Sequence, residues 1–227
     1  MKFKVQRQVL EKDVKVLFVV IENVDNKTIS EEYIMYRNHK VKELYEKYKD
    51  FNVKEDKILE GYHLLHDYIH VKRRKNVPAS ENLIRMLIKR KNIGSINKIV
   101  DLYNLISIDS KIALGAHDMD QTEGNVTLRF TDGSENYQPL KSNQNVKIAL
   151  NEYAYIDDSN TVLCRLEIRQ VKKTLVNEDT RNVWYIVQGN EFTDDSQLME
   201  VASQIIEITT AYCSGTGKII IPDIIDL

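Results

Sequence analysis

The sequence changes character near residue 110, and this change limits the fold more than any other feature of the chain. Before it, apolar residues recur every three or four positions, which is the spacing of helices that bury one face. After it, short runs rich in β-branched residues are separated by turn signals such as TDGSEN and DDSN, which is typical of strands. Helices followed by clustered strands predict an α+β fold: a mixed or antiparallel sheet with helices packed around it and a helix-rich N-terminal part.

The individual elements follow from the same spacing rules. Helices are predicted over residues 31–49, 55–71, 80–93, 95–108 and 196–212. Strands are predicted over residues 14–21, 126–130, 146–150, 162–171, 182–188 and 218–222. With only three prolines and eight glycines the chain contains no long linker, so we expect a single domain over residues 1–227.

Composition excludes several classes of protein. Cys164 and Cys213 are the only cysteines and form no CxxC pair, which argues against a disulfide framework and a thiolate zinc site. The longest apolar runs, such as residues 14–21, are much shorter than the roughly 20 residues of a membrane span. The N-terminus has no signal-peptide pattern. We therefore expect a cytoplasmic protein without a membrane anchor.

Positive charge is concentrated in one part of the chain. The formal net charge is −2, but residues 70–98 carry nine basic residues and a single acidic one, Glu81. A patch of this kind is expected of a protein that binds a phosphate backbone, and a solvated helix face is the alternative. The candidate RNA-binding residues are Lys72, Arg73, Arg74, Lys75, Lys89, Arg90 and Lys91.

Three histidines, His63, His66 and His70, share one face of the helix predicted over residues 55–71. Such a face could supply nitrogen ligands to a metal. No carboxylate or cysteine partner is evident and four basic residues follow, so we expect no metal here. A partly exposed face near RNA phosphates, or plain surface, is the interpretation we prefer.

His117 and Asp118, with Asp120 nearby, have the most chemical character of any local segment. A histidine beside carboxylates can orient water or accept a proton near neutral pH. A structural histidine in a loop fits the local sequence equally well.

Four arginines lie in or beside the predicted strands: Arg129, Arg165, Arg169 and Arg181. Arg165 and Arg169 are four residues apart on one predicted strand and would point to the same face. Arginines in apolar strands are costly unless paired, so they either line a polar pocket or form an internal ion-pair network, for example with Glu167 or Asp157.

Several motifs in conserved order resemble one known family. The matching positions are Val100, Asp101 and Asn104 in VDLYN, Ala116, Asp118 and Asp120 in AHDMD, Arg129, Glu135, and Thr180, Asn182 and Val183 in EDTRNVWYIV. Together they resemble the tRNA-binding and editing domain, often labelled B-three/B-four, of the phenylalanyl-tRNA synthetase beta subunit. The chain resembles still more closely the short free-standing versions of that domain, which carry GAHD and a Cys-Arg…Arg strand, as LCRLEIRQ does here.

The resemblance implies an editing-domain-like α+β fold, with a core over residues 80–190, a helical N-terminal extension over residues 1–75 and a closing helix and strand over residues 191–227. In the synthetase this domain hydrolyses tyrosine misattached to phenylalanine tRNA. The present chain departs from the pattern. Gly115 stands where the family has a histidine, Ile186 stands where it has a glutamate, and its glycine-rich segment is replaced by LCRLEIRQ.

The resemblance therefore predicts a protein that binds tRNA or aminoacyl-tRNA and hydrolyses a misattached aminoacyl ester in trans, without a cofactor. His117 and Asp118 are the candidate catalytic residues. The candidate pocket residues are Asn104, Arg129, Arg165, Arg169 and Thr180. A non-catalytic tRNA- or RNA-binding module and a small-molecule binder are the alternatives.

Overall fold

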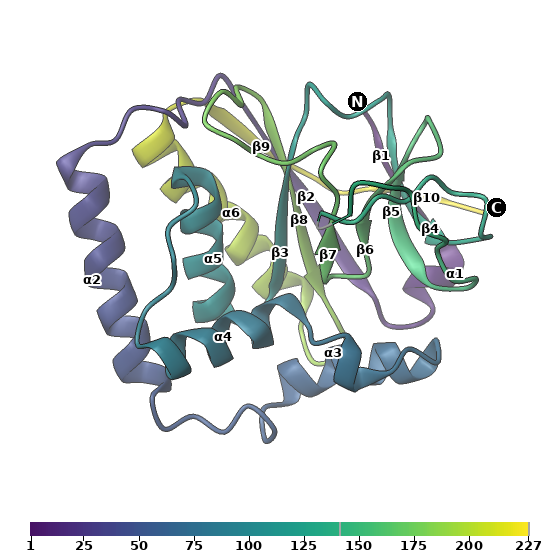
Figure 1. The fold of residues 1–227 in the computed structure, drawn as a ribbon, viewed down its shortest axis with the longest axis horizontal. Coiled ribbons are helices and arrows are strands. Elements are labelled where there is room, and N and C mark those ends of the chain that lie inside the picture. The colour runs from purple at the N-terminus through teal and green to yellow at the C-terminus, as the bar shows by residue number, and fades with distance from the viewer. Residues whose placement is uncertain (141, 227) are drawn as a thin grey trace.

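The strands of this protein form two sheets in the computed structural model, which describes residues 1–140 and 142–226 (Figure 1). The six-stranded sheet has the order β10-β1-β4-β5-β6-β7 and comprises β1 (Phe3–Gln6), β4 (Val126–Phe130), β5 (Tyr153–Asp157), β6 (Val162–Arg165), β7 (Arg169–Gln170) and β10 (Asp223–Ile225). It is mixed, because β1 pairs in parallel with β4 and β10 while the other pairs are antiparallel. The four-stranded sheet has the order β3-β8-β2-β9, is antiparallel throughout and comprises β2 (Lys15–Glu22), β3 (Ala113–Asp118), β8 (Val183–Gly189) and β9 (Thr216–Ile220). The predicted α+β class is confirmed.

The helices gather mainly on one side of the four-stranded sheet (Figure 1). They are α1 (Arg7–Leu10), α2 (Glu31–Tyr48), α3 (Lys57–Tyr68), a 3-10 turn η1 (Arg73–Lys75), α4 (Ala79–Arg90), α5 (Lys98–Ser110) and α6 (Asp195–Cys213). Helices α2, α5 and α6 lie on the side of the four-stranded sheet that faces away from the six-stranded sheet. Helix α3 runs below the ends of the strands in this view. No helix of the described residues is both long enough and apolar enough to cross a membrane.

Strand β2 shows how one sequence serves two cores. Its apolar residues are continuous rather than alternating, which is the pattern of a strand covered on both faces. Phe18 and Val20 point toward the six-stranded sheet, where Phe18 stacks on Phe3 with ring centroids 4.3 Å apart. Val19 and Ile21 point the other way, into the core beneath α5 and α6. Because β1 and β2 belong to the two sheets, the N-terminal segment is part of both cores.

Two strand predictions were wrong. Residues 146–150 form no strand, because only Ile148 of this run is well buried, and the neighbouring strand is β5 instead. The strand predicted over residues 162–171 is interrupted at Leu166, whose φ of 55° reverses the chain between β6 and β7. Four strands were missed: β1, β3, β5 and β10.

Candidate functional site

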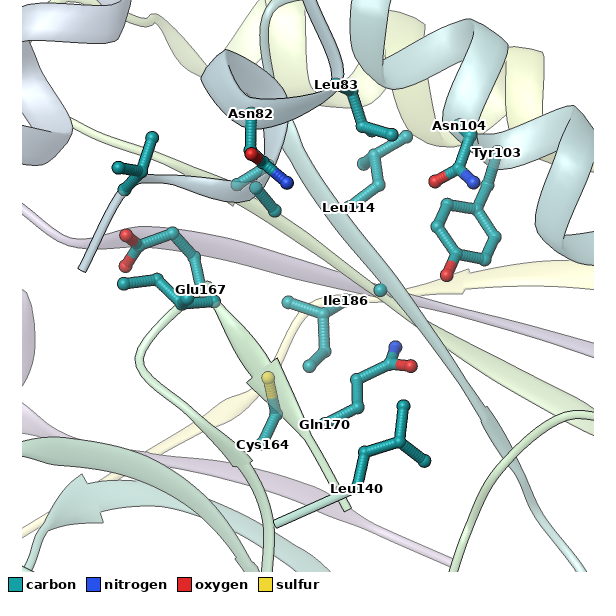
Figure 2. A pocket seen from close by; sticks show the side chains of 15 residues that line it. Asn82, Leu83, Tyr103, Asn104, Leu114, Leu140, Cys164, Glu167, Gln170 and Ile186 are labelled. Atoms are coloured by element: carbon teal, nitrogen blue, oxygen red, sulfur yellow. The ribbon is translucent and has the colours of Figure 1, made fainter. Parts of the chain in front are cut away.

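A cavity of about 240 Å³ opens where α4 and α5 meet the adjoining strands of the two sheets (Figure 2). Its polar lining residues are Asn82, Tyr103, Asn104, Glu167 and Gln170, and its larger apolar ones are Leu83, Leu114, Leu140, Ile168 and Ile186. Asn104, a predicted pocket residue, does line this cavity and points into it from α5. Within the described part of the chain, the side-chain amides of Asn82 and Asn104 form no hydrogen bond, so both are available to a guest.

The floor of the cavity contains two of the positions at which the chain departs from the pattern of the family it resembles. Gly115 on β3 and Ile186 on β8 are direct partners across the antiparallel pair, and both line the cavity. The amide of Gln170 covers Gly115: a β-carbon at position 115 would lie 3.1 Å from its Nε2 atom. Gln170 is itself held by a 3.1 Å hydrogen bond donated to the carbonyl of Ala116. The space of the missing histidine is therefore occupied by a neutral amide.

Glu167 belongs to a buried polar network at the edge of the cavity. His66 Nε2 lies 2.6 Å from one carboxylate oxygen, and the Tyr153 hydroxyl donates to the other at 2.5 Å. Burial opposes both charges, yet the pairing outweighs it: the pKa of His66 lies above its ordinary value and that of Glu167 below. Both side chains are fully buried, so Glu167 is a carboxylate already committed to partners within the protein.

Cys164 and Tyr103 are neutral at the cavity wall. Burial raises the pKa of the Cys164 thiol to about 12, which leaves it protonated and a poor nucleophile. Burial likewise raises the pKa of the Tyr103 phenol above its ordinary value. The chemistry available at this site is hydrogen bonding by amides and a phenol rather than attack by a side chain.

His117 and Asp118, the predicted catalytic residues, do not line the cavity. The imidazole of His117 is fully buried, stacks on Trp184 with ring centroids 4.3 Å apart, and meets the Thr174 hydroxyl at 2.8 Å. Burial lowers its pKa to about 3. Asp118 accepts a 2.6 Å hydrogen bond from the Thr180 hydroxyl. Thr180, a predicted pocket residue, therefore lies beside Asp118 and also does not line the cavity. The three polar groups hold loops to the end of β3.

Arg165 and Arg169 are likewise absent from the cavity lining and are not on one strand. They face each other across the β6–β7 turn. Arg165 forms a two-pronged ion pair with Glu152 and donates to the Asn76 side chain at 2.9 Å, while exposed Arg169 donates to the Lys75 carbonyl at 3.1 Å. The two arginines thus fix the end of η1, at Lys75 and Asn76, against the sheet.

Arg129 lies on the six-stranded sheet, outside the cavity. It donates to Glu135 at 2.6 Å and to the Asn160 side chain at 2.8 Å. Arg129 and Arg165 are therefore described better by the ion-pair alternative than by a shared pocket. Their partners differ from those expected, since Asp157 pairs with Lys173 instead of an arginine.

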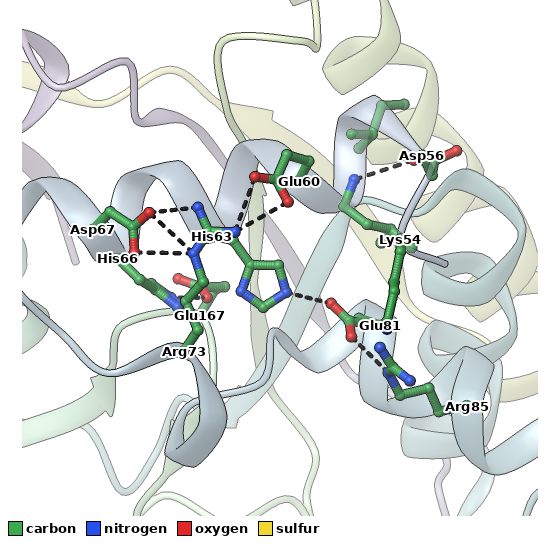
Figure 3. Close-up of polar contacts among 12 residues, drawn as sticks. Lys54, Asp56, Glu60, His63, His66, Asp67, Arg73, Glu81, Arg85 and Glu167 are labelled. Carbon is green, nitrogen blue, oxygen red and sulfur yellow. Dashed lines mark hydrogen bonds and ion pairs between the residues drawn. The ribbon is translucent and has the colours of Figure 1, made fainter. Parts of the chain in front are cut away.

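The predicted RNA-binding residues are mostly exposed. Lys72, Arg74, Lys75, Lys89, Arg90 and Lys91 have exposed side chains, and none of the six forms an ion pair within residues 1–140 and 142–226. Arg73 differs, because it pairs with Glu60 at 2.9 Å and also with Asp67 (Figure 3). Two residues after Lys75, the chain reaches Val77 in the cavity lining, so the first basic cluster adjoins the cavity.

The histidine face predicted on α3 is divided among three environments. His63 meets the buried Glu81 at 2.6 Å, and Glu81 also accepts from Arg85 at 2.6 Å (Figure 3). His66 is buried, so the preferred surface interpretation was wrong for it, and His70 lies beyond the helix end at a φ of 59°. In the described ranges, no three His, Cys, Asp or Glu side chains are grouped to hold a metal.

Several cavity residues were not identified from sequence: Asn82, Tyr103, Glu167 as a lining residue, and Gln170. The available signal was the pair of departures at positions 115 and 186. Had β3 been recognised, antiparallel pairing with β8 would have placed these positions on one face and marked the cavity floor.

Comparisons with known proteins agree with the sequence resemblance and with the fold. A family model described as B3/4 domain matches residues 68–205. The fold is similar to an N-terminal fragment of the phenylalanyl-tRNA synthetase beta subunit from Pyrococcus horikoshii, with a TM-score of 0.50 and 12% identity over 99% of this chain. The match covers 52% of that fragment, so this chain spans about half its length. No curated protein sequence matches. The predicted kinship is confirmed, and the chain belongs to the B3/4 domain family.

Proposed function

We propose that this protein binds the aminoacylated acceptor end of a tRNA and hydrolyses a misattached aminoacyl ester in trans. One observation carries the proposal: a cavity is present at Asn104, Gly115 and Ile186, the positions that correspond to the family's motif residues, and free amides belong to its lining. A volume of about 240 Å³ is smaller than the roughly 300–1,000 Å³ of drug-sized sites, which suits a single amino-acid side chain.

The reaction asks little of the protein beyond orientation. An aminoacyl ester is activated already, so a positioned water and donors aimed at the developing oxyanion accelerate its hydrolysis. The Asn104 amide can donate to the carbonyl oxygen and accept a hydrogen bond from the attacking water. As the bond between the acyl carbon and the ribose oxygen breaks, the proton released by the water passes to that departing oxygen, which leaves a free amino acid and a tRNA hydroxyl. Glu167 orders the wall through His66 and Tyr153 and is not the base in this mechanism, because its carboxylate is buried and paired with His66. His117 and Asp118 have structural roles in this mechanism.

The basic residues supply the contacts to the nucleic acid. The exposed cluster at residues 72–75 adjoins the cavity, and the cluster at residues 89–91 ends α4. Lysine and arginine contacts to phosphates give affinity without reading sequence and weaken as salt rises. We assign the tRNA backbone to this face, with the aminoacyl group directed past Val77 into the cavity.

A panel of mischarged tRNAs, incubated with excess protein, tests the proposal. We expect at least one ester to lose its amino acid about tenfold faster than without protein, and Asn104→Ala to abolish the gain. Asn38→Ala, at an exposed position on α2, is the matched control and should retain it. Unchanged ester half-lives across the panel would refute catalysis. Salt-sensitive tRNA binding without hydrolysis would identify the non-catalytic RNA-binding alternative.

A further inference from the structure

The wall of the cavity is predominantly apolar. Leu83 and Leu114 approach from α4 and β3, and Ile186 forms part of the floor (Figure 2). Leu140 and Ile168 complete this surface from the six-stranded sheet side. Because apolar surface leaving water favours an apolar partner, this wall suits a hydrocarbon side chain.

The cavity offers no free charge to a guest. Its described lining includes no lysine, arginine or histidine, and Glu167 is its single carboxyl group. That carboxylate is engaged by His66 and Tyr153, and Figure 2 shows it directed away from Asn104 and Tyr103. A charged side chain in the cavity would therefore lose its water without gaining a partner, which is strongly unfavourable.

Ile186 and Gln170 set this neutral character. Ile186 presents hydrocarbon where a polar residue on β8 would reach into the cavity. Gln170 covers Gly115, and its Nε2 already donates a hydrogen bond to the Ala116 carbonyl. The amide is neutral and therefore gives a charged guest no counter-charge. The polar groups with unmet hydrogen-bonding capacity, Asn82 and Asn104, are suited to the amino and ester groups that every aminoacyl end shares.

We propose that the cavity selects aminoacyl groups with uncharged, apolar side chains, with Ile186 and Gln170 as specificity-determining residues. This inference rests on the proposed function, because it takes the guest to be an aminoacyl end. It goes further in naming the substrate class: amino acids such as leucine or methionine rather than aspartate or lysine.

Non-hydrolysable probes separate this inference from catalysis. We would titrate the full chain calorimetrically with 3′-amino-3′-deoxyadenosine that carries a leucyl, methionyl, aspartyl or lysyl group in amide linkage. The leucyl and methionyl probes should bind at least about tenfold more tightly than the charged ones. Equal or tighter binding of a charged probe would overturn the selectivity while leaving the proposed function standing. Failure of every probe to bind would overturn both.

Variants test the assignment of Ile186. Ile186→Gln replaces hydrocarbon by an amide of similar volume and should reduce the ratio of leucyl to aspartyl affinity about tenfold. Ile186→Ala, which serves if the first variant folds poorly, should reduce the ratio to a smaller extent. Ile96→Gln, at a position 66% exposed, should leave the ratio unchanged. An unchanged ratio in both Ile186 variants would remove that residue from the specificity determinants. Apolar-selective binding without hydrolysis of any ester would uphold the selectivity and refute the deacylase.

Discussion

His117 makes the stability of this protein depend on pH in a defined way. Its imidazole is fully buried against Trp184, and its Nε2 atom has no hydrogen-bond partner among the described residues. Burial lowers its pKa from 6.5 to about 3, so the folded state holds this histidine neutral while the unfolded state protonates it below about pH 6.5. The unfolded state therefore binds more protons, and stability falls as pH falls. Between about pH 7.5 and about pH 5 the loss from this one group is about 2 kcal/mol, at 1.36 kcal/mol per pKa unit.

Urea unfolding followed by the fluorescence of Trp184, the only tryptophan, measures this effect. The relevant quantity is the difference between wild type and His117→Gln, because other titrating groups contribute equally to both. The wild type should lose about 2 kcal/mol more than the variant over that pH range. The same substitution at exposed His39 should leave the wild-type pH dependence intact. Parallel pH profiles for wild type and His117→Gln would refute the assignment of His117 as a buried neutral group.

Three further predictions follow from packing and charge. Glu167→Gln should destabilise the fold by about 3 kcal/mol because it leaves His66 without its buried partner. Calorimetric unfolding should show the full loss between pH 4.5 and 6.5, the ordinary pKa values of the two groups. The loss should shrink as the pH rises from 6.5 through the raised pKa of His66, and as it falls from 4.5 through the lowered pKa of Glu167. Gly61→Ala should cost about 1–3 kcal/mol in urea unfolding, because the new β-carbon would lie 2.2 Å from Oδ1 of the buried Asn190 side chain; an unchanged midpoint would contradict this packing. Neutralising the basic residues at positions 72–75 should weaken tRNA binding and flatten its salt dependence in filter binding, whereas an unchanged slope would place the RNA elsewhere.

The elements with strong periodicity could be predicted from sequence. Helices α2, α3, α5 and α6 and strand β2 lie within a few residues of their predicted bounds, because each buries a regular stripe or a continuous apolar run. Strand β3 could not be recognised in the same way. Its sequence, ALGAHD, is short of β-branched residues, and its strand conformation depends on pairing with β8.

The site depends on that missed pairing. His117 is two residues beyond Gly115 on β3, so both share a face of the sheet, about 7 Å apart along the strand. The cavity lies over the pair of Gly115 with Ile186, while His117 pairs with Trp184 and is closed off between the sheets. The local sequence suggests His117 as a catalytic residue, but the register of β3 against β8 decides which residue of β3 lies at the cavity.

The arginines illustrate a second limit of sequence reasoning. Four-residue spacing placed Arg165 and Arg169 on a single strand, yet the positive φ at Leu166 folds the segment into a hairpin. Their partners, Glu152 and the carbonyl of Lys75, are distant in sequence, so neither contact could be inferred from spacing.

The central claim is tested most directly by the affinity of the protein for two forms of one tRNA: one that carries an amino acid through a stable amide, and one that carries no amino acid. If the aminoacyl group enters the cavity, burial of an apolar side chain should make binding about ten- to a hundredfold tighter than that of the same tRNA without an amino acid. Asn104→Ala should diminish this gain. Equal affinity for the two forms would contradict the account, since the cavity would then take no part in recognising the tRNA.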